Sequence, residues 1–372
     1  MKHHAEYRDP EAAKRVLKRI HQSVDPSREY RFMEFCGGHT HAISRFGLHG
    51  LLPSNVRLIH GPGCPVCVLP IGRLDMAIAL AMKPGVILCC YGDTLRVPGS
   101  EGNSLQKARA YGADVRMVYS ASEVLTIAEQ SPSADVVFFA IGFETTTPPT
   151  AHLLLETQRR GLNQVSVLCN HVLTPAAIRA ILEDSEQGPR LDGLVGPAHV
   201  SVVIGSSPYT PLASDFQMPI VIAGFEPLDI LQAILMLIHQ VNEDRHAVEN
   251  EYTRAVVPEG NQRALMAMRE VFETRESFEW RGLGSIADSG LRIRSSFASW
   301  DAESRYDLAY QTVADHKACE CAAILRGQKE PLDCKVFGTA CTPETPLGAC
   351  MVSSEGACAA HFTYGRNLRN FR

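Results

Sequence analysis

The chain has 372 residues, of which 45% are hydrophobic and 21% charged, so it is long enough for two or three globular domains. Lys and Arg total 36 against 41 Asp and Glu, and the formal net charge of −5 gives no indication of a broad basic surface for nucleic acid. The start, MKHHAEYRDP, has no apolar signal core, and Lys83, Glu226 and Asp229 interrupt the most apolar stretches before they reach the roughly 18 residues of a membrane span. We therefore expect a cytoplasmic protein that binds neither nucleic acid nor a membrane.

The predicted elements begin with a helix over 11–22. From about residue 30 to 242, short β-rich runs alternate with helical segments, which is the pattern of parallel α/β units. A long apolar helix over 227–241 closes this region. In such sheets, ligands bind where the strands end at their carboxyl edge. The predicted strands are 30–35, 56–60, 85–90, 114–119, 135–141, 164–169, 191–195 and 219–223.

Sequence motifs at the strand ends recur at a nearly constant offset. We interpret this recurrence as two similar Rossmann-like domains with parallel sheets, 26–130 and 131–242; chance repetition of strand–glycine–helix signals is the alternative. The recurring pairs are FCGGH at 35–39 with LCNH at 168–171, HGPGCPV at 60–66 with VGPAHVS at 195–201, and CYGD at 90–93 with AGFEP at 223–227.

The remainder of the chain forms a third predicted domain. The region 243–318 is polar and irregular, and it leads into a tail rich in Cys, Gly and Pro. We assign 1–25 together with 243–372 to a cysteine-rich iron–sulfur domain, mostly irregular or helical, in which metal ligation offsets a poor apolar core.

The twelve cysteines indicate metal binding or redox chemistry, because a disulfide framework does not persist in a reducing compartment. Three of them, Cys89, Cys90 and Cys169, lie in apolar runs and are expected to be small buried hydrophobes. The other nine lie either in early glycine-rich loops or in the tail. We therefore expect separate groups of cysteines with separate roles.

The first of the glycine-rich loops reads Cys36-Gly-Gly-His39-Thr-His41 and directly follows a predicted strand. Its glycines let the backbone approach a ligand, and its cysteine and histidines supply thiolate and imidazole. A turn that packs Cys36 inward is the alternative. The attached GGHTH favours a ligand site.

The second loop, Gly61-Pro-Gly-Cys64-Pro-Val-Cys67, places two cysteines on a rigid turn. Such a pair can hold one metal ion or close into a disulfide. Since Cys36, Cys64 and Cys67 all follow strands of the same predicted domain, they could converge on one soft-metal site, for which iron is a suitable ion. Plain burial of the pair is the alternative.

A third motif, GFETT at 142–146, follows a strongly apolar strand and starts a helix. Glu144 is interpreted either as a capping residue or as a proton donor and acceptor. His171 and His199, at strand ends of the second predicted domain, each have a structural role as the simpler interpretation.

The tail contains six cysteines in a segment with many Gly and Pro residues. Four thiolates can hold an iron–sulfur cluster, and the two that remain suggest a dithiol or disulfide beside it. Structural zinc on four of them is the competing interpretation. The six are Cys319, Cys321, Cys334, Cys341, Cys350 and Cys358.

Together these motifs resemble those of the HypD family of hydrogenase formation and maturation proteins, which helps to assemble the iron centre of nickel–iron hydrogenases. The resemblance covers nearly the whole chain. The motifs that carry it are CGGHTH at 36–41, GPGCPVC at 61–67, GFETT at 142–146, AGFEPLD at 223–229, and CxxFGxxC and GACMVSSEGAC in the tail.

This resemblance implies a scaffold, rather than a conventional turnover enzyme, on which Fe(II) acquires two cyanides and one carbon monoxide. The implied partners are a small chaperone, HypC, whose N-terminal cysteine shares the iron, and HypE, which delivers cyanide. Carried over to this chain, Cys36 becomes an iron ligand with His39 beside it, and Cys64 and Cys67 become a redox pair at the same iron. Glu144 or His39 would manage protons near the bound cyanide.

The family's tail carries a [4Fe-4S] cluster in a setting similar to ferredoxin–thioredoxin reductase. The resemblance assigns Cys319, Cys334, Cys341 and Cys358 to the cluster and leaves Cys321 and Cys350 as a thiol pair, although either Cys319 or Cys321 could reach. A cluster-dependent protein disulfide reductase that uses Cys64 and Cys67 is the alternative function. A non-catalytic interaction module with structural zinc is a third.

Overall fold

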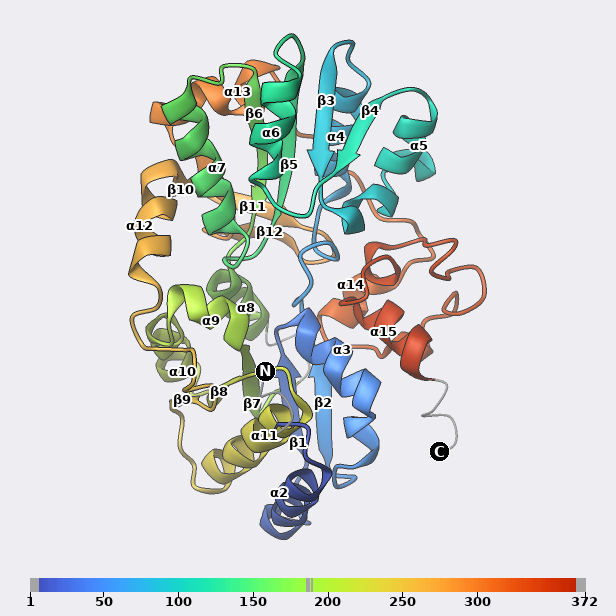
Figure 1. Cartoon of the computed structure of the whole chain (residues 1–372). Helices are drawn as coiled ribbons and strands as arrows, with labels where there is room; N and C mark the ends of the chain where they lie inside the picture. The colour runs from blue at the N-terminus through green and yellow to red at the C-terminus, as the bar shows by residue number, and fades with distance from the viewer. Residues whose placement is uncertain (1–6, 185–187, 189, 366–372) are drawn as a thin grey trace.

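The computed structural model describes residues 7–184, 188 and 190–365. Two parallel sheets lie one above the other in Figure 1, and the C-terminal tail packs beside the level at which they meet. The expected α/β class, with two parallel-sheet domains and a cysteine-rich segment, is confirmed. No helix in the described ranges combines the length and the apolar character needed to cross a bilayer.

The lower sheet has five parallel strands, and helices cover both of its faces. In order across the sheet the strands are β2 (Val56–His60), β1 (Tyr30–Glu34), β7 (Gly193–Pro197), β8 (Ile220–Ala223) and β9 (Val248–Asn250). One face packs on α2 (Pro10–Ser23), α3 (Gly37–Phe46) and α11 (Pro227–Asn242), and the other on α8 (Thr174–Glu183), α9 (Ala198–Ile204) and α10 (Thr210–Asp215). Because successive side chains of a strand point to opposite faces, Val221 enters the first core and Ile222 the second.

The upper sheet has four parallel strands. In order they are β4 (Asp114–Met117), β3 (Val86–Cys90), β5 (Asp135–Gly142) and β6 (Val165–His171). One face packs on α6 (Glu123–Gln130), α7 (Thr147–Arg160) and α12 (Gln262–Val271), and the other on α4 (Ile71–Ala81) and α5 (Leu105–Ala110). Here Phe138 and Phe139, both fully buried, belong to the two different cores.

The predicted strands and the two predicted helices are all present, with ends shifted by a few residues. The domain boundaries 26–130 and 131–242, however, do not follow the sheets, because β1 and β2 pair with β7–β9, and the strands between them form the other sheet. The interpreted duplication would place the counterparts of β1 and β2, which are β6 and β7, side by side in one sheet. They lie in different sheets, so the recurrence reflects a repeated strand–glycine–helix signal and not the predicted pairing.

The region expected to be irregular, 243–318, is largely structured. It supplies β9 and α12, and two antiparallel ribbons in which β10 (Phe272–Thr274) pairs with β13 (Leu291–Ile293) and β11 (Ser277–Trp280) with β12 (Gly284–Ala287). Phe278 and Trp280, two residues apart on β11, both point into the core below the upper sheet, and Trp280 is fully buried. Two buried aromatic side chains are thus enough to order a short, otherwise polar ribbon.

The cysteine-rich tail has short helices joined by turns, as predicted. The helices are α14 (Cys321–Leu325) and α15 (Ala357–Tyr364), and α15 packs against α3 of the lower sheet. The ring of Tyr364 meets that of His41 edge-on, with 5.2 Å between centroids. The end of the chain therefore lies beside one of its first motifs.

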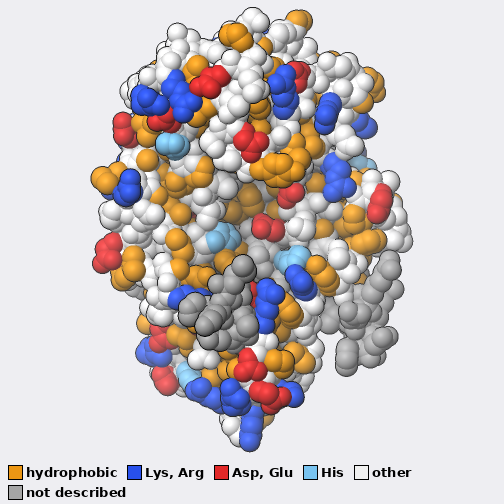
Figure 2. Space-filling view, viewed as in Figure 1, with side chains coloured by type: hydrophobic (Ala, Val, Ile, Leu, Met, Phe, Trp, Pro, Cys, Tyr) orange, Lys and Arg blue, Asp and Glu red, His pale blue; other side chains and the backbone are white. Residues whose placement is uncertain are grey.

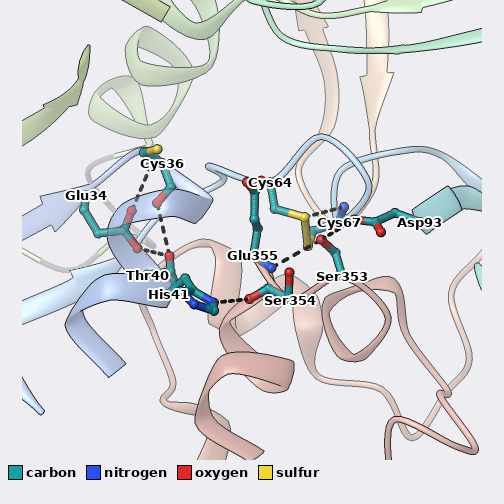
Figure 3. The surroundings of a disulfide bond; sticks show 10 residues. All are labelled: Glu34, Cys36, Thr40, His41, Cys64, Cys67, Asp93, Ser353, Ser354 and Glu355. Atoms are coloured by element: carbon teal, nitrogen blue, oxygen red, sulfur yellow. Dashed lines mark hydrogen bonds between the residues drawn. A yellow bond between two sulfur atoms is a disulfide. The ribbon is translucent and has the colours of Figure 1, made fainter. Parts of the chain in front are cut away.

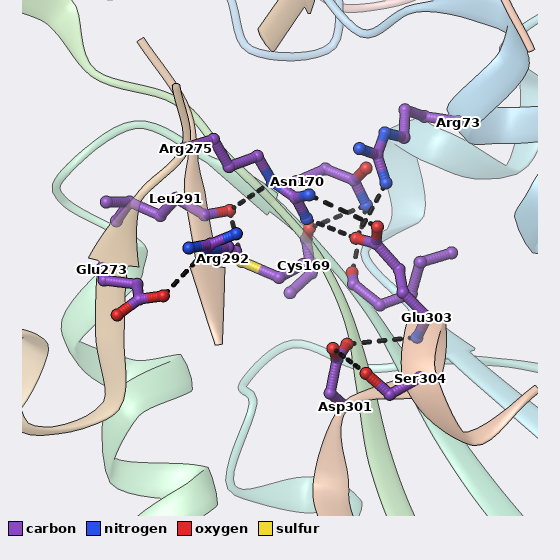
Figure 4. A network of polar contacts seen from close by, with 12 residues as sticks. Arg73, Cys169, Asn170, Glu273, Arg275, Leu291, Arg292, Asp301, Glu303 and Ser304 are labelled. Atoms are coloured by element: carbon purple, nitrogen blue, oxygen red, sulfur yellow. Dashed lines mark hydrogen bonds and ion pairs between the residues drawn. The ribbon is translucent and has the colours of Figure 1, made fainter. Parts of the chain in front are cut away.

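A buried ionic network joins α4 to the segments that follow α12 (Figure 4). Glu303, in α13 (Ala302–Arg305), lies between two guanidinium groups: its Oε1 is 2.8 Å from Arg73 Nη1, and its carboxylate also accepts from Arg275. Both guanidinium groups stand over the ring of Phe278, at 5.1 and 5.9 Å from its centroid. Burial lowers the pKa of Arg73, and the carboxylate of Glu303 opposes this effect by stabilising the charged guanidinium group in the core.

We expect Glu303→Ala to reduce the free energy of unfolding by about 3 kcal/mol, because it leaves two partly desolvated guanidinium groups without their shared carboxylate. Urea denaturation followed by tryptophan fluorescence measures the change. Glu273→Ala is the matched control, since it removes an exposed pair with Arg292 and should cost less than about 1 kcal/mol. Equal losses in the two variants would contradict the role assigned to Glu303.

Candidate functional site

The loops that follow the strands of the two sheets face one another across a hollow. Figure 2 shows this hollow at the centre of the visible face, with acidic and histidine side chains gathered around it. Side chains from both levels meet here: Cys36 follows β1, the Cys64–Cys67 loop follows β2, Asp93 follows β3 and His199 follows β7. This is the carboxyl edge at which parallel sheets place their ligands.

Cys36 lies at the start of α3 and is fully buried. Its Sγ is 3.3 Å from Nδ1 of His199, which stands near the start of α9. Burial raises the pKa of Cys36 well above its ordinary value, and burial lowers that of His199 to about 4. At neutral pH the pair is therefore a thiol beside a neutral imidazole that can accept its proton.

The backbone around Cys36 is fixed by contacts from the next loop. The N–H of Gly37 donates to the carbonyl of Gly63 at 2.8 Å, and a Cβ on Gly63 would come within 2.2 Å of the Cys36 nitrogen. Only glycine allows this approach. The two cysteine motifs are thus packed backbone to backbone.

A buried carboxylate lies directly beneath the thiol. Glu34 accepts from the Cys36 N–H at 2.8 Å, from the hydroxyl of Thr40, and from Nδ1 of His60 at 2.9 Å. Burial raises the pKa of Glu34, and the nearby charge of Glu34 adds to the effect of burial on the pKa of Cys36. Glu34 was not predicted as a site residue, although this residue ends the strand that precedes CGGHTH.

His39 contacts the Cys36 thiol through its backbone: hydrogen bonds from the N–H groups of Gly38 and His39 lower the pKa of Cys36 and so oppose the effect of burial. Its Nε2 is 3.0 Å from the carbonyl oxygens of both Ala223 and Gly224, so this nitrogen carries the hydrogen and donates it. The ring of Phe225 stands between the two imidazoles, with centroids 5.3 Å from His39 and 5.2 Å from His199. Burial lowers the pKa of His39 to about 4, so it is a neutral positioning group.

Cys64 and Cys67 are joined by a disulfide, one of the two states expected of this motif (Figure 3). Both are buried. In this state neither sulfur is a thiolate, so either could serve as a ligand only after reduction. In Figure 3 the disulfide and Cys36 lie on opposite sides of Glu355.

The tail contributes to the same place. Ser353 donates to Asp93 at 3.1 Å, the carbonyl of Ser354 is 3.4 Å from Nδ1 of His41, and Glu355 lies between the disulfide and Cys36 (Figure 3). Burial, with the charges of Asp93 and Glu34, raises the pKa of Glu355. Glu355 was not predicted as a site residue, and His199 was expected to have a structural role. The sequence features that could have identified them are SSEG in the tail and GPAH at the end of a strand.

Glu144 lies after β5 and is buried. Its carboxylate accepts from the N–H and the hydroxyl of Thr174, both at 2.8 Å, which ties the upper sheet to the start of α8. Burial raises its pKa to about 7. Among the described contacts, none of its hydrogen bonds goes to a cysteine motif, so the structure gives it an anchoring position.

The six tail cysteines lie in one neighbourhood. Cys321 is linked by side-chain hydrogen bonds to Cys319, Cys350 and Cys358, and its bond to Cys319 lowers the pKa of Cys319 to about 7. Cys341 and Cys334 lie near enough to influence one another electrostatically. A Cβ on Gly348 would meet the sulfur atoms of Cys319 and Cys321 at 2.4 and 2.8 Å, so the backbone leaves room where sulfurs gather.

This donor set suits an iron–sulfur cluster in its chemistry, because it offers six soft thiol ligands in one segment. Within the described ranges, no three His, Cys, Asp or Glu side chains already converge as a closed metal-binding group. Cluster binding would therefore require the thiol side chains to turn toward a common centre. Cys319, Cys334, Cys341 and Cys358 remain the predicted ligands.

Comparisons with known proteins agree with the motifs. The family model HypD, described as "Hydrogenase formation hypA family", matches residues 11–365. The chain is 60% identical over 370 residues to the hydrogenase maturation factor HypD2 of Bradyrhizobium diazoefficiens, covering 98% of this chain and 97% of that protein. It is 61% identical over 369 residues to the HypD of Azotobacter vinelandii, with 98% and 97% covered, and 46% identical over 364 residues to that of Escherichia coli, with 96% and 97% covered.

We expect Glu144→Gln to remove a pH dependence of stability. Because the pKa of Glu144 is raised in the folded state, its contribution is fully present below about pH 4.5 and is lost as pH rises through about 7, a change of roughly 3 kcal/mol at 1.36 kcal/mol per pKa unit. Urea midpoints measured across this range test it. Glu183→Gln, which removes an exposed carboxylate beside Arg179, should keep the wild-type slope, and an unchanged slope in Glu144→Gln would count against the assignment.

Proposed function

This chain belongs to the HypD family and is a hydrogenase maturation factor, and we propose that it is the scaffold on which an iron ion receives cyanide and carbon monoxide. The observation that supports this proposal most directly is the buried thiol of Cys36, which contacts His199 and lies on a loop packed against the loop of the Cys64–Cys67 disulfide. Iron is the cargo in this proposal, and the protein supplies one ligand and the means to deprotonate it.

The chemistry at Cys36 follows from its burial. Its raised pKa keeps the thiol protonated until a cation arrives, and a thiol must lose its proton to become an iron ligand. The neutral imidazole of His199 accepts that proton at Nδ1, and the acidic groups Glu34 and Glu355 favour a dication over the empty site. Binding of Fe(II) thus replaces the thiol proton.

The Cys64–Cys67 disulfide provides a second function at the same hollow. Its reduction takes two electrons and two protons and gives two thiols, either of which could then contact the iron. A [4Fe-4S] cluster held by Cys319, Cys334, Cys341 and Cys358 would supply single electrons. Cys321 and Cys350, joined by a hydrogen bond, are the thiol pair that would connect the two redox groups.

Hydrogenase maturation implies contact with other maturation proteins. We propose that a HypC-type chaperone adds its own cysteine to the iron opposite Cys36, and that a HypE-type donor brings cyanide. His199 contacts the Cys36 thiol and Glu355 lies between Cys36 and the disulfide, so we assign the handling of protons at bound cyanide to these two residues.

A protein disulfide reductase is the second candidate, and the disulfide at Cys64 and Cys67 favours it specifically. In that function the reduced pair would attack a disulfide in a substrate protein. Turnover of such a substrate without iron or cyanide would distinguish it from the scaffold.

We expect Cys36→Ala, purified anaerobically with its small partner, to lose the infrared bands of iron-bound cyanide and carbon monoxide, because the variant lacks the thiolate ligand. Cys169→Ala is the control: that thiol is equally buried, but its hydrogen bonds go to the backbone of Leu291 and His171, so the bands should persist. Survival of the bands in Cys36→Ala would overturn the scaffold proposal.

We further expect Cys334→Ala to lower iron and acid-labile sulfide and to abolish the visible absorption of a cluster, since the variant removes one of four ligands. Cys89→Ala should retain the iron and sulfide, because Cys89 is buried in the upper sheet. Stoichiometric zinc without iron or sulfide in the wild-type protein would instead indicate the structural zinc module.

A further inference from the structure

The loop after β8, residues 223–226, positions both imidazoles of the thiol site. Its carbonyls accept from His39, and Phe225 stacks between His39 and His199. Phe225 also packs over Gly38, next to the Cys36 sulfur. Any movement of this loop therefore changes the access to Cys36 and the partner of its thiol.

Asp229, Glu251 and Arg254 form a charged cluster that contacts this loop. Asp229, in the first turn of α11, is fully buried; its Oδ2 accepts from Arg254 at 2.6 Å and from the N–H of Glu226 at 3.3 Å. Its Oδ1 is also buried and accepts no hydrogen bond from the described residues. Glu251, just after β9, accepts from the N–H of Gly224 at 3.4 Å and lies against Asp229.

A fully buried carboxyl group, Asp229, and a partly buried one next to it, Glu251, cannot both stay ionised at little cost with only one arginine beside them. Burial and the charge of Asp229 raise the pKa of Glu251 to about 8. At neutral pH Glu251 therefore carries a proton, and a side-chain hydrogen bond joins it to Asp229.

The cluster also fixes the start of the chain. The guanidinium of Arg254 lies 3.8 Å from the ring centroids of both Tyr7 and Tyr252. The Tyr7 carbonyl accepts from the N–H of Leu228 at 3.3 Å, and Arg8 pairs with Glu226. The groups that face Glu251 are thus Asp229, Arg254 and the two tyrosine rings, with the Arg8 pair at the rim.

We propose that Asp229 and Glu251 share one proton and are positioning residues for the Cys36 site, so that loss of this proton to solvent loosens loop 223–226 and exposes the thiol. The repulsion of two carboxylates acts directly on the loop, because Glu251 binds the Gly224 N–H and Asp229 binds the Glu226 N–H. This inference rests on the proposed function only because it takes Cys36 as the thiol that binds iron.

The test is the rate at which iodoacetamide alkylates Cys36 in the full chain, followed by peptide mass spectrometry below and above pH 8. In Glu251→Gln the amide can donate the same hydrogen bond to Asp229 but cannot lose it. We expect wild-type and variant rates to be equal at lower pH, and the wild-type rate to exceed the variant's by about tenfold above the transition, the factor expected for one lost charged hydrogen bond. A ratio that does not change with pH would overturn the proposal.

Two controls separate loosening of the loop from unfolding or from a nearby charge effect. Glu249→Gln, two residues away on β9, removes an exposed pair with Arg245 and should follow the wild-type profile. Cys169, buried in the upper sheet, serves as the internal reference, because its alkylation reports global opening and should not follow the Glu251 transition.

If Glu251→Gln does not fold, Tyr7→Ala provides an independent test, since it removes one face of the Arg254 clamp at the start of the chain. It should raise the alkylation rate of Cys36 at every pH and leave that of Cys169 unchanged; an unchanged Cys36 rate would contradict the proposal. Alkylation needs no iron, so persistence of iron-bound cyanide in Cys36→Ala would refute the scaffold and leave this result standing.

Discussion

The packing of two parallel sheets with their carboxyl edges toward one space is the constraint on which the rest of the molecule depends. Strand ends leave backbone groups and loops free at that edge, and each sheet alone would offer a shallow rim. With the edges opposed, the loops after β1, β2, β3 and β7 close around one hollow. The backbone contact between Gly37 and Gly63 then fixes the distance between the two cysteine motifs.

The electrostatics of the hollow follow from this enclosure. Removal of water raises the pKa values of Cys36, Glu34 and Glu355 and lowers those of His39 and His199, so these five groups are driven toward their neutral forms. A site of this kind stores protons that a divalent cation can displace.

Much of the fold was predictable because its signals are local. The strands are continuous apolar runs followed by glycine, and α2 and α11 have clear boundaries, so periodicity located them within a few residues. The assignment of strands to sheets was not predictable in this way, since it depends on where the crossovers between β2 and β3 and between β6 and β7 lead. The ribbons of β10–β13 were missed because each strand has only three or four residues and one or two buried side chains, too few for a recognisable alternating pattern.

The site shows the same division. Cys36, Cys64 and Cys67 lie in sequence motifs that indicate a ligand or redox site. His199 and Glu355 belong to the site only through contacts between residues distant in the sequence. No local spacing connects residue 355 with residue 36. For Glu144 the reverse holds: its motif predicted a possible site residue, and in the structure its carboxylate binds Thr174 at the junction of the two sheets.

The contact of α15 with α3 has a consequence for biosynthesis. Domains generally fold from the N-terminus during translation. Here, however, β1 and β2 wait for β7 to β9 before their sheet is complete, and Glu355 and α15 are translated long after the α3 on which α15 packs. A nascent chain on the ribosome therefore displays the CGGHTH loop without its covering tail. The order of synthesis itself delays the complete site until α15 has been translated.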